Sequence, residues 1–78
     1  MTAAMNAREK FTADLAAVNV VLPLRYEERD GTIFDAAGRP VCTIDVNRER
    51  LDIEVHKIGM WLTLAVNTCG GFKLEQSQ

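Results

Sequence analysis

The sequence predicts an α+β domain in which a three-stranded antiparallel sheet packs against a long C-terminal helix, with an additional N-terminal helix. Apolar residues recur every three to four positions near both ends of the chain, which is the period of an amphipathic helix. Between these regions, two glycine-containing turn signals separate short segments rich in β-branched and aromatic residues. A chain of 78 residues is near the lower size limit for one hydrophobic core, so we expect a single small domain over residues 1–78.

The first helix is expected over residues 3 to 18. Its apolar stripe at helical spacing consists of Ala4, Ala7, Phe11, Leu15 and Val18. Pro23 follows a β-branched segment and cannot continue a helix, because proline lacks the backbone N–H group and clashes with the preceding turn. The chain therefore changes from helix to strand before Leu24.

Three strands are expected at residues 25–29, 32–35 and 40–46. Asp30-Gly31 is a hairpin signal between the first two. Asp35-Ala36-Ala37-Gly38 is a turn between the second and third, because Asp can hydrogen-bond its own turn and Gly adopts a positive φ. If each turn contains a glycine bulge, the core face carries Leu24, Tyr26, Phe34, Cys42, Ile44 and Val46, and the polar face carries Arg25, Glu27, Asp35, Thr43 and Asp45. Ile33 and Val41 would then be neighbours on the polar face, where the first helix or a partner would cover them.

The second helix is expected over residues 48 to 69, after an N-cap at Asn47. Its apolar stripe comprises Leu51, Val55, Ile58, Leu62, Ala65 and Cys69, widened by Trp61 and Val66. Gly70-Gly71 follows the helix, where free carbonyl groups repel phosphate, so the pair is interpreted as a C-terminal cap. We expect a positive φ at Gly70 or Gly71 and a buried Phe72.

The composition argues against several classes of function. A net charge of −2 and a pI near 5.2 give no electrostatic reason to bind nucleic acid directly. The longest apolar run is too short to span a bilayer, and no signal-peptide core can be drawn near the start, so neither membrane insertion nor export is expected. Two cysteines in so small a protein are interpreted as reduced thiols of a cytosolic protein.

The residues that could support catalysis are few. A zinc site needs four ligands, whereas the chain has Cys42, Cys69 and His56 as its only thiols and imidazole. Cys69 lies about 20 Å from His56 on the same expected helix. Cys42 stays within possible reach of His56, but strand alternation places it on the core face, where a thiol is a small hydrophobe. We expect no catalytic residue, no metal and no cofactor, and hence no enzyme.

Acidic residues are concentrated in the middle of the chain. Eight of the eleven acids lie between residues 27 and 54, and with four arginines they give this segment a net charge of −4. Such a surface could dock on a basic groove of a partner protein. The same pattern is typical of a solvated outer sheet face. The candidate partner-binding residues are Glu27, Glu28, Asp30, Asp35, Asp45 and Glu49.

Two stretches carry a resemblance to a known type of protein. DGTIFDAAGRPVCTI, followed by a helix ending WLTLAVNTCGGF, resembles very small phage and prophage proteins with a strand, an Asp-Ala-x-Gly turn, a second strand and a helix ending Ala-Val-Asn. Asp35, Ala36 and Gly38 match the turn, and Ala65, Val66 and Asn67 match the helix end; the resemblance covers about residues 22 to 72. The size, acidic balance and composition are similar to phage-encoded anti-CRISPR proteins, particularly type I-C inhibitors.

This resemblance implies a non-enzymatic inhibitor in the host cell cytoplasm. It would bind a protein subunit of the host's type I CRISPR surveillance complex, as a monomer or weak homodimer, and block capture or cleavage of target DNA. Two alternatives stay open. One is a small structural or accessory phage protein that acts through subunit contacts, with Ile33 and Val41 as the contact. The other is a regulator that binds a host protein unrelated to CRISPR.

Overall fold

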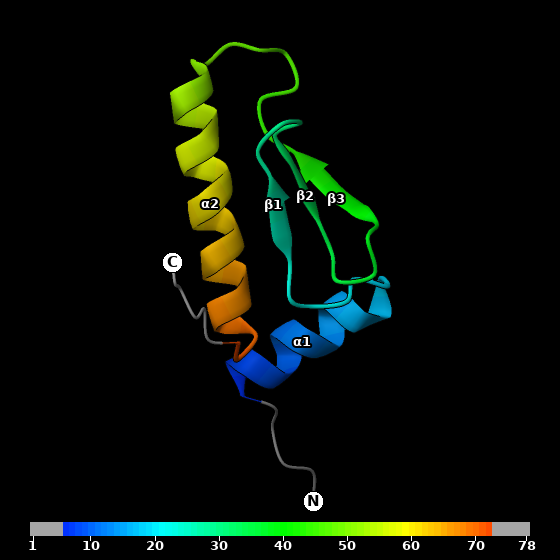
Figure 1. The fold of residues 1–78 in the computed structure, drawn as a ribbon. Helices are drawn as coiled ribbons and strands as arrows, with labels where there is room; N and C mark the ends of the chain where they lie inside the picture. Colours follow the sequence, from blue (N-terminus) through cyan, green and yellow to red (C-terminus); the bar gives the residue numbers. More distant parts are fainter. Residues whose placement is uncertain (1–5, 73–78) are drawn as a thin grey trace, which may run out of the picture.

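The fold consists of two helices and one sheet, and a computed structural model describes them over residues 6–72. The elements are α1 (Ala7–Ala17), β1 (Arg25–Glu27), β2 (Thr32–Phe34), β3 (Pro40–Thr43) and α2 (Asp52–Cys69). The strands form one antiparallel sheet in the order β1-β2-β3, and α2 packs along β1 and β2. Helix α1 crosses the end of the molecule where α2 finishes (Figure 1). The predicted α+β architecture is confirmed.

Helix α1 is closed at its start by a reciprocal cap. The Asn6 side chain accepts a hydrogen bond from the Glu9 backbone N–H at 2.8 Å, and Glu9 accepts one from the Asn6 N–H at 3.1 Å. Phe11 and Leu15 are half-buried, as the predicted stripe requires, but Val18 is exposed. The helix stops at Ala17, shortly before the left-handed backbone of Asn19, which has φ of 65°. Residues 3–5 of the predicted helix lie outside the described part of the chain.

The pairing of β1 with β2 differs by one residue from the predicted register. Tyr26 pairs with Ile33, and Arg25 pairs with Phe34. A shift of one residue moves every side chain of a strand to the opposite face. Ile33 is therefore 2 % exposed and faces α2, whereas Phe34 lies on the opposite face, with the Arg25 guanidinium 4.8 Å from its ring centre. The prediction that Phe34 belongs to the core face was wrong.

Strand β3 is an uncovered edge of the sheet. Its four residues are all exposed, and α2 lies over β1 and β2 instead (Figure 1). Cys42, which pairs with Ile33, is exposed rather than part of a core, and Val46 is exposed as well. Since Ile33 is buried, the predicted patch of Ile33 and Val41 does not form. The strand ends before Asp45, whose φ of 56° interrupts the extended backbone that the prediction continued to residue 46.

Helix α2 turns a different face toward the sheet from the one predicted. Its buried residues are Gly59, Thr63 and Asn67. Each directly follows a residue of the predicted stripe, namely Ile58, Leu62 and Val66. Position 59 has room for the Tyr26 ring only when it is glycine, because a Cβ atom there would overlap that ring. The larger apolar residues of the stripe lie at the side or on the outside of α2. The predicted stripe is therefore correct in period but wrong in orientation.

The start of α2 is set by the loop that precedes it. The Asp45 carboxylate accepts backbone N–H groups of Glu49 and Arg50, both at 2.9 Å, and this holds residues 45–50 in a loop. The helix begins at Asp52 with Leu51 as N-cap, and the Glu54 side chain accepts the Leu51 N–H at 3.3 Å. The predicted N-cap at Asn47 and the predicted helix start at residue 48 are wrong.

The end of α2 is a glycine cap. Gly71 has φ of 93°, its N–H donates to the Thr68 carbonyl at 3.0 Å, and the Phe72 N–H donates to the Asn67 carbonyl at 2.9 Å. These two bonds form the Schellman pattern. The predicted cap is confirmed. Phe72 is 39 % exposed, however, so its predicted burial was wrong.

A buried asparagine connects α2 to the segment before β1. Asn67 is 2 % exposed; its Oδ1 accepts the Leu24 N–H at 2.6 Å, and its Nδ2 donates to the Leu24 carbonyl at 2.9 Å. Both backbone groups of Leu24 are thus satisfied by one side chain from 43 residues further along the chain. Within residues 6–72, Leu24 and Ile33 are the only buried hydrophobic residues. The core is therefore small, and this polar clamp forms part of it.

Candidate functional site

Acidic side chains from two distant segments meet at the end of the molecule where α2 begins. The β1–β2 turn and the loop from β3 into α2 lie side by side there (Figure 1). We define the acidic end as Glu27, Glu28, Asp30, Asp45, Glu49, Asp52 and Glu54, together with Arg29, Arg48 and Arg50. Seven carboxylates and three guanidinium groups give this surface a net charge of −4.

Four of the six predicted partner-binding acids are accessible on this surface. Glu28, Asp30 and Glu49 are exposed, and the Glu28 side chain is 75 % exposed. Glu27 is half-buried and lies 3.2 Å from the Arg25 guanidinium. Exposed pairs of this kind contribute little to stability, so these charges are free to face a partner.

Asp35, the fifth predicted acid, lies at the opposite end of the sheet and holds the fold together. It is 1 % exposed. Its carboxylate accepts the backbone N–H groups of Arg39 at 2.9 Å, Val21 at 3.1 Å and Ala37 at 3.0 Å. These bonds, that of Arg39 first, lower the pKa of Asp35 below its ordinary value. Asp35 thus ties the β2–β3 turn to the segment before β1 and is not available to a partner.

Asp45, the sixth, lies at the acidic end but is bonded within its own loop. The backbone N–H groups of Glu49 and Arg50 lower the pKa of its carboxyl group. Its role is to shape the loop that carries the exposed Glu49. Asp52 and Glu54 were counted in the acidic segment of the sequence but were not among the predicted partner-binding residues, although their position in the first turn of a helix with acidic neighbours was the available signal.

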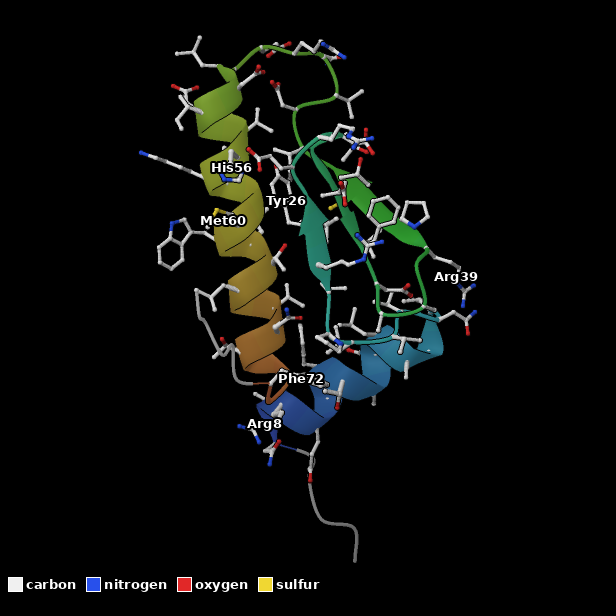
Figure 2. All side chains as sticks on the ribbon, in the orientation of Figure 1. Arg8, Tyr26, Arg39, His56, Met60 and Phe72 are labelled. Carbon is white, nitrogen blue, oxygen red and sulfur yellow. The ribbon has the colours of Figure 1, made fainter. Side chains whose placement is uncertain are left out.

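A hollow of about 1120 Å³ opens beside the acidic end, between the start of α2 and the sheet. Tyr26 and His56 line it, with ring centres 5.6 Å apart (Figure 2). Burial raises the pKa of the Tyr26 hydroxyl, and the charges of Glu28 and Asp52 raise it further. His56 is half-buried here.

Tyr26, His56 and Glu28 are not joined by side-chain hydrogen bonds within the described residues. His56 Nδ1 lies 3.9 Å from Glu28 Oε2, beyond hydrogen-bond distance, and has no hydrogen-bond partner within the described residues. A raised pKa keeps Tyr26 protonated at neutral pH. Cys42 is not among the residues that line the hollow, and Cys69 lies at the far end of α2. Over residues 6–72, no three metal-binding side chains gather into a possible site.

The outer side of α2 is a second surface of unusual character. Large apolar residues that the sheet leaves uncovered include Ile53, Met60, Trp61 and Leu62. Neither helix in the described part of the chain is both long and apolar enough to cross a membrane. Exposed apolar side chains grouped in this way make the face a candidate contact surface.

Comparisons with known protein families, with curated proteins and with solved structures find no match for this chain. What the chain does must therefore be inferred from its own surfaces. The acidic end and the outer side of α2 are the two surfaces with a chemical character that a partner could recognise.

Proposed function

We propose that the protein is a non-enzymatic phage anti-CRISPR inhibitor that works in the host cell cytoplasm. It binds a protein subunit of a type I CRISPR surveillance complex, with type I-C as the first system to test, and blocks binding or cleavage of target DNA. The resemblance of residues 22 to 72 to small phage proteins supports this proposal. A basic DNA-binding channel is the natural docking site for an acidic protein of this size.

The observation that carries the proposal is the convergence of the two acidic segments into one exposed surface. Residues 27–30 and 45–54 are separated by two strands in the sequence, yet the two segments lie side by side (Figure 1). Five of their acidic residues line one hollow: Glu27, Glu28, Asp30, Asp45 and Asp52. A surface with a net charge of −4 favours approach to a basic partner and sets the orientation of docking. Because Asp35 is buried at the other end, the binding surface consists of Glu27, Glu28, Asp30 and Glu49, extended by Asp52 and Glu54.

The test uses charge variants with matched changes in net charge. The double variant E28Q/D30N raises the net charge by two at the acidic end. The control D14K raises it by the same amount on α1, where Asp14 is exposed and pairs with Lys10 at 3.0 Å. Neither variant touches Asp35 or Asp45, whose carboxylates are bonded to backbone.

The assay combines co-purification with a purified type I-C surveillance complex and a gel-shift measurement of its binding to target DNA. The unaltered protein and D14K should co-purify and suppress the DNA shift, whereas E28Q/D30N should bind several-fold more weakly, with a smaller dependence on salt. Absence of co-purification together with unimpaired DNA binding would refute action on the surveillance complex. Equal inhibition by all three proteins would show that the acidic end is not the binding surface.

A small structural or accessory phage protein acting through subunit contacts is the second candidate. The exposed apolar residues on the outer side of α2 favour it. Such a protein should appear in purified phage particles or form assemblies that grow with concentration. An inhibitor should be absent from the particles and should assemble no further than a dimer.

A further inference from the structure

The outer side of α2 is apolar from Ile58 onward, whereas Glu54 and Lys57 are charged residues on the turns before it. None of the residues from Ile58 to Cys69 is charged. The sheet covers only the side that carries Gly59, Thr63 and Asn67, so Trp61 is 66 % exposed and Met60 is 50 % exposed. Large apolar side chains that gather on an exposed face are typical of a contact surface. This helix is covered on one side only.

Within residues 6–72, no segment covers this face. Helix α2 packs against β1 and β2, and α1 lies across the end of α2 (Figure 1). The uncovered face runs along a helix of 18 residues, about 27 Å long.

We propose that the outer face of α2 pairs with the same face of a second copy of this chain, with the two helices antiparallel about a two-fold axis near Trp61. The outward half of such a helix, about 10–12 Å across, presents on the order of 500 Å². Two copies would bury about 1,000 Å² in total, which is at the low end for specific interfaces. We therefore expect a dimer whose population depends on protein concentration.

The distribution of charge selects the antiparallel arrangement. In a parallel pair, the two acidic ends would lie together, with Asp52 and Glu54 facing their own copies. In the antiparallel pair, Asp52 of one copy lies near the end of α2 of the other. Arg8 stands at that end, because its guanidinium lies 3.5 Å from the position that a Cβ atom on Gly71 would occupy (Figure 2). Acid thus faces base at both ends of the dimer. Glu28, Asp30 and Glu49 of each copy, which precede α2 and are exposed, stay free.

The mass of the full chain in solution tests the pairing. Sedimentation measured over a concentration series should give 8.7 kDa at the lowest concentrations and rise toward twice that value. Trp61 is the only tryptophan, so its emission should shift to shorter wavelength over the same range as the dimer buries it. Both changes should follow one binding curve.

Matched substitutions locate the interface. W61E should abolish the rise in mass. V18E should leave it unchanged, although Val18 has the same exposed fraction, 66 %, because it lies at the end of α1 away from the outer face of α2. A mass of 8.7 kDa at every concentration would overturn the proposal, whatever the emission wavelength of Trp61. Dimerisation that W61E leaves intact would overturn it as well.

The thiol of Cys69 reports the direction of the helices. In the variant C42S, Cys69 is the only thiol, and it lies eight positions beyond Trp61. In the antiparallel dimer the two Cys69 residues are about 24 Å apart, so mild oxidation should give no disulfide-linked dimer. Rapid formation of a Cys69–Cys69 disulfide at a concentration where the dimer is populated would overturn the antiparallel arrangement.

Discussion

Replacement of Asn67 by alanine should be among the most damaging single changes in the molecule. The Asn67 side chain satisfies both backbone groups of Leu24, at 2.6 and 2.9 Å, in a region that is almost fully buried. Asn67→Ala leaves a buried N–H and a buried carbonyl without partners, and each such group costs about 1–3 kcal/mol. Because water can enter part of the space left by the amide, we expect a combined loss of about 2–4 kcal/mol.

A loss of this size is large for the domain. Small domains are stable by roughly 5–15 kcal/mol, and 1 kcal/mol corresponds to about 4–8 °C in melting temperature at this chain length. Thermal and urea unfolding followed by far-UV circular dichroism should therefore place the Tm of the variant at least about 10 °C below that of the unaltered protein. All samples must share one protein concentration, because association changes apparent stability.

Two further variants separate the clamp from general damage to the helix. N47A removes the same side chain from the exposed loop before α2, where the sequence suggested a helix cap, and should change stability by less than about 0.5 kcal/mol. N67D keeps an acceptor for the Leu24 N–H but, when ionised, has no donor for the Leu24 carbonyl, so its stability should improve as the pH is lowered and the carboxyl group gains a proton. A loss below about 0.5 kcal/mol for N67A would refute the reasoning.

Two other predictions follow from described contacts. Backbone N–H bonds lower the pKa of Asp35, so its contribution to stability is complete above the ordinary value near pH 4 and declines as the pH falls through the lowered pKa. D35N should therefore melt well below the unaltered protein at pH 7, and the difference should narrow in acid; a difference independent of pH would contradict this. Replacing a glycine inside a helix by alanine normally stabilises the helix by up to about 1 kcal/mol. In Gly59→Ala, however, the new methyl group would overlap the Tyr26 ring, so the Tm should fall. A higher Tm would show that the ring moves aside freely.

Local signals in the sequence were enough to order the elements. The Asp30-Gly31 and Asp35 turns and the glycine cap at Gly71 each depend on a few neighbouring residues, and the structure contains all three. The register of β1 with β2 could not be predicted in the same way. A glycine bulge and a four-residue turn are both compatible with the sequence, and the choice between them decides whether Ile33 or Phe34 faces α2.

The orientation of α2 was wrong for a different reason. Pattern analysis assigns the largest apolar residues to the core, whereas the sheet selects Gly59, Thr63 and Asn67, because the Tyr26 ring and the Leu24 backbone need a small residue and an amide opposite them. The candidate site was predicted in part. Clustering in the sequence indicated the acidic end, but burial of Asp35 depends on Val21, which no local pattern connects to it.

Strand β3 is an exposed edge of the sheet, and exposed edges promote aggregation. An open edge strand offers unpaired backbone groups to any passing chain, and this risk is greatest while the domain is still folding. Here the edge is only four residues long and begins with Pro40, which has no N–H group to donate. The short length of this strand and its initial proline therefore limit edge-to-edge pairing, although one side of the sheet is open.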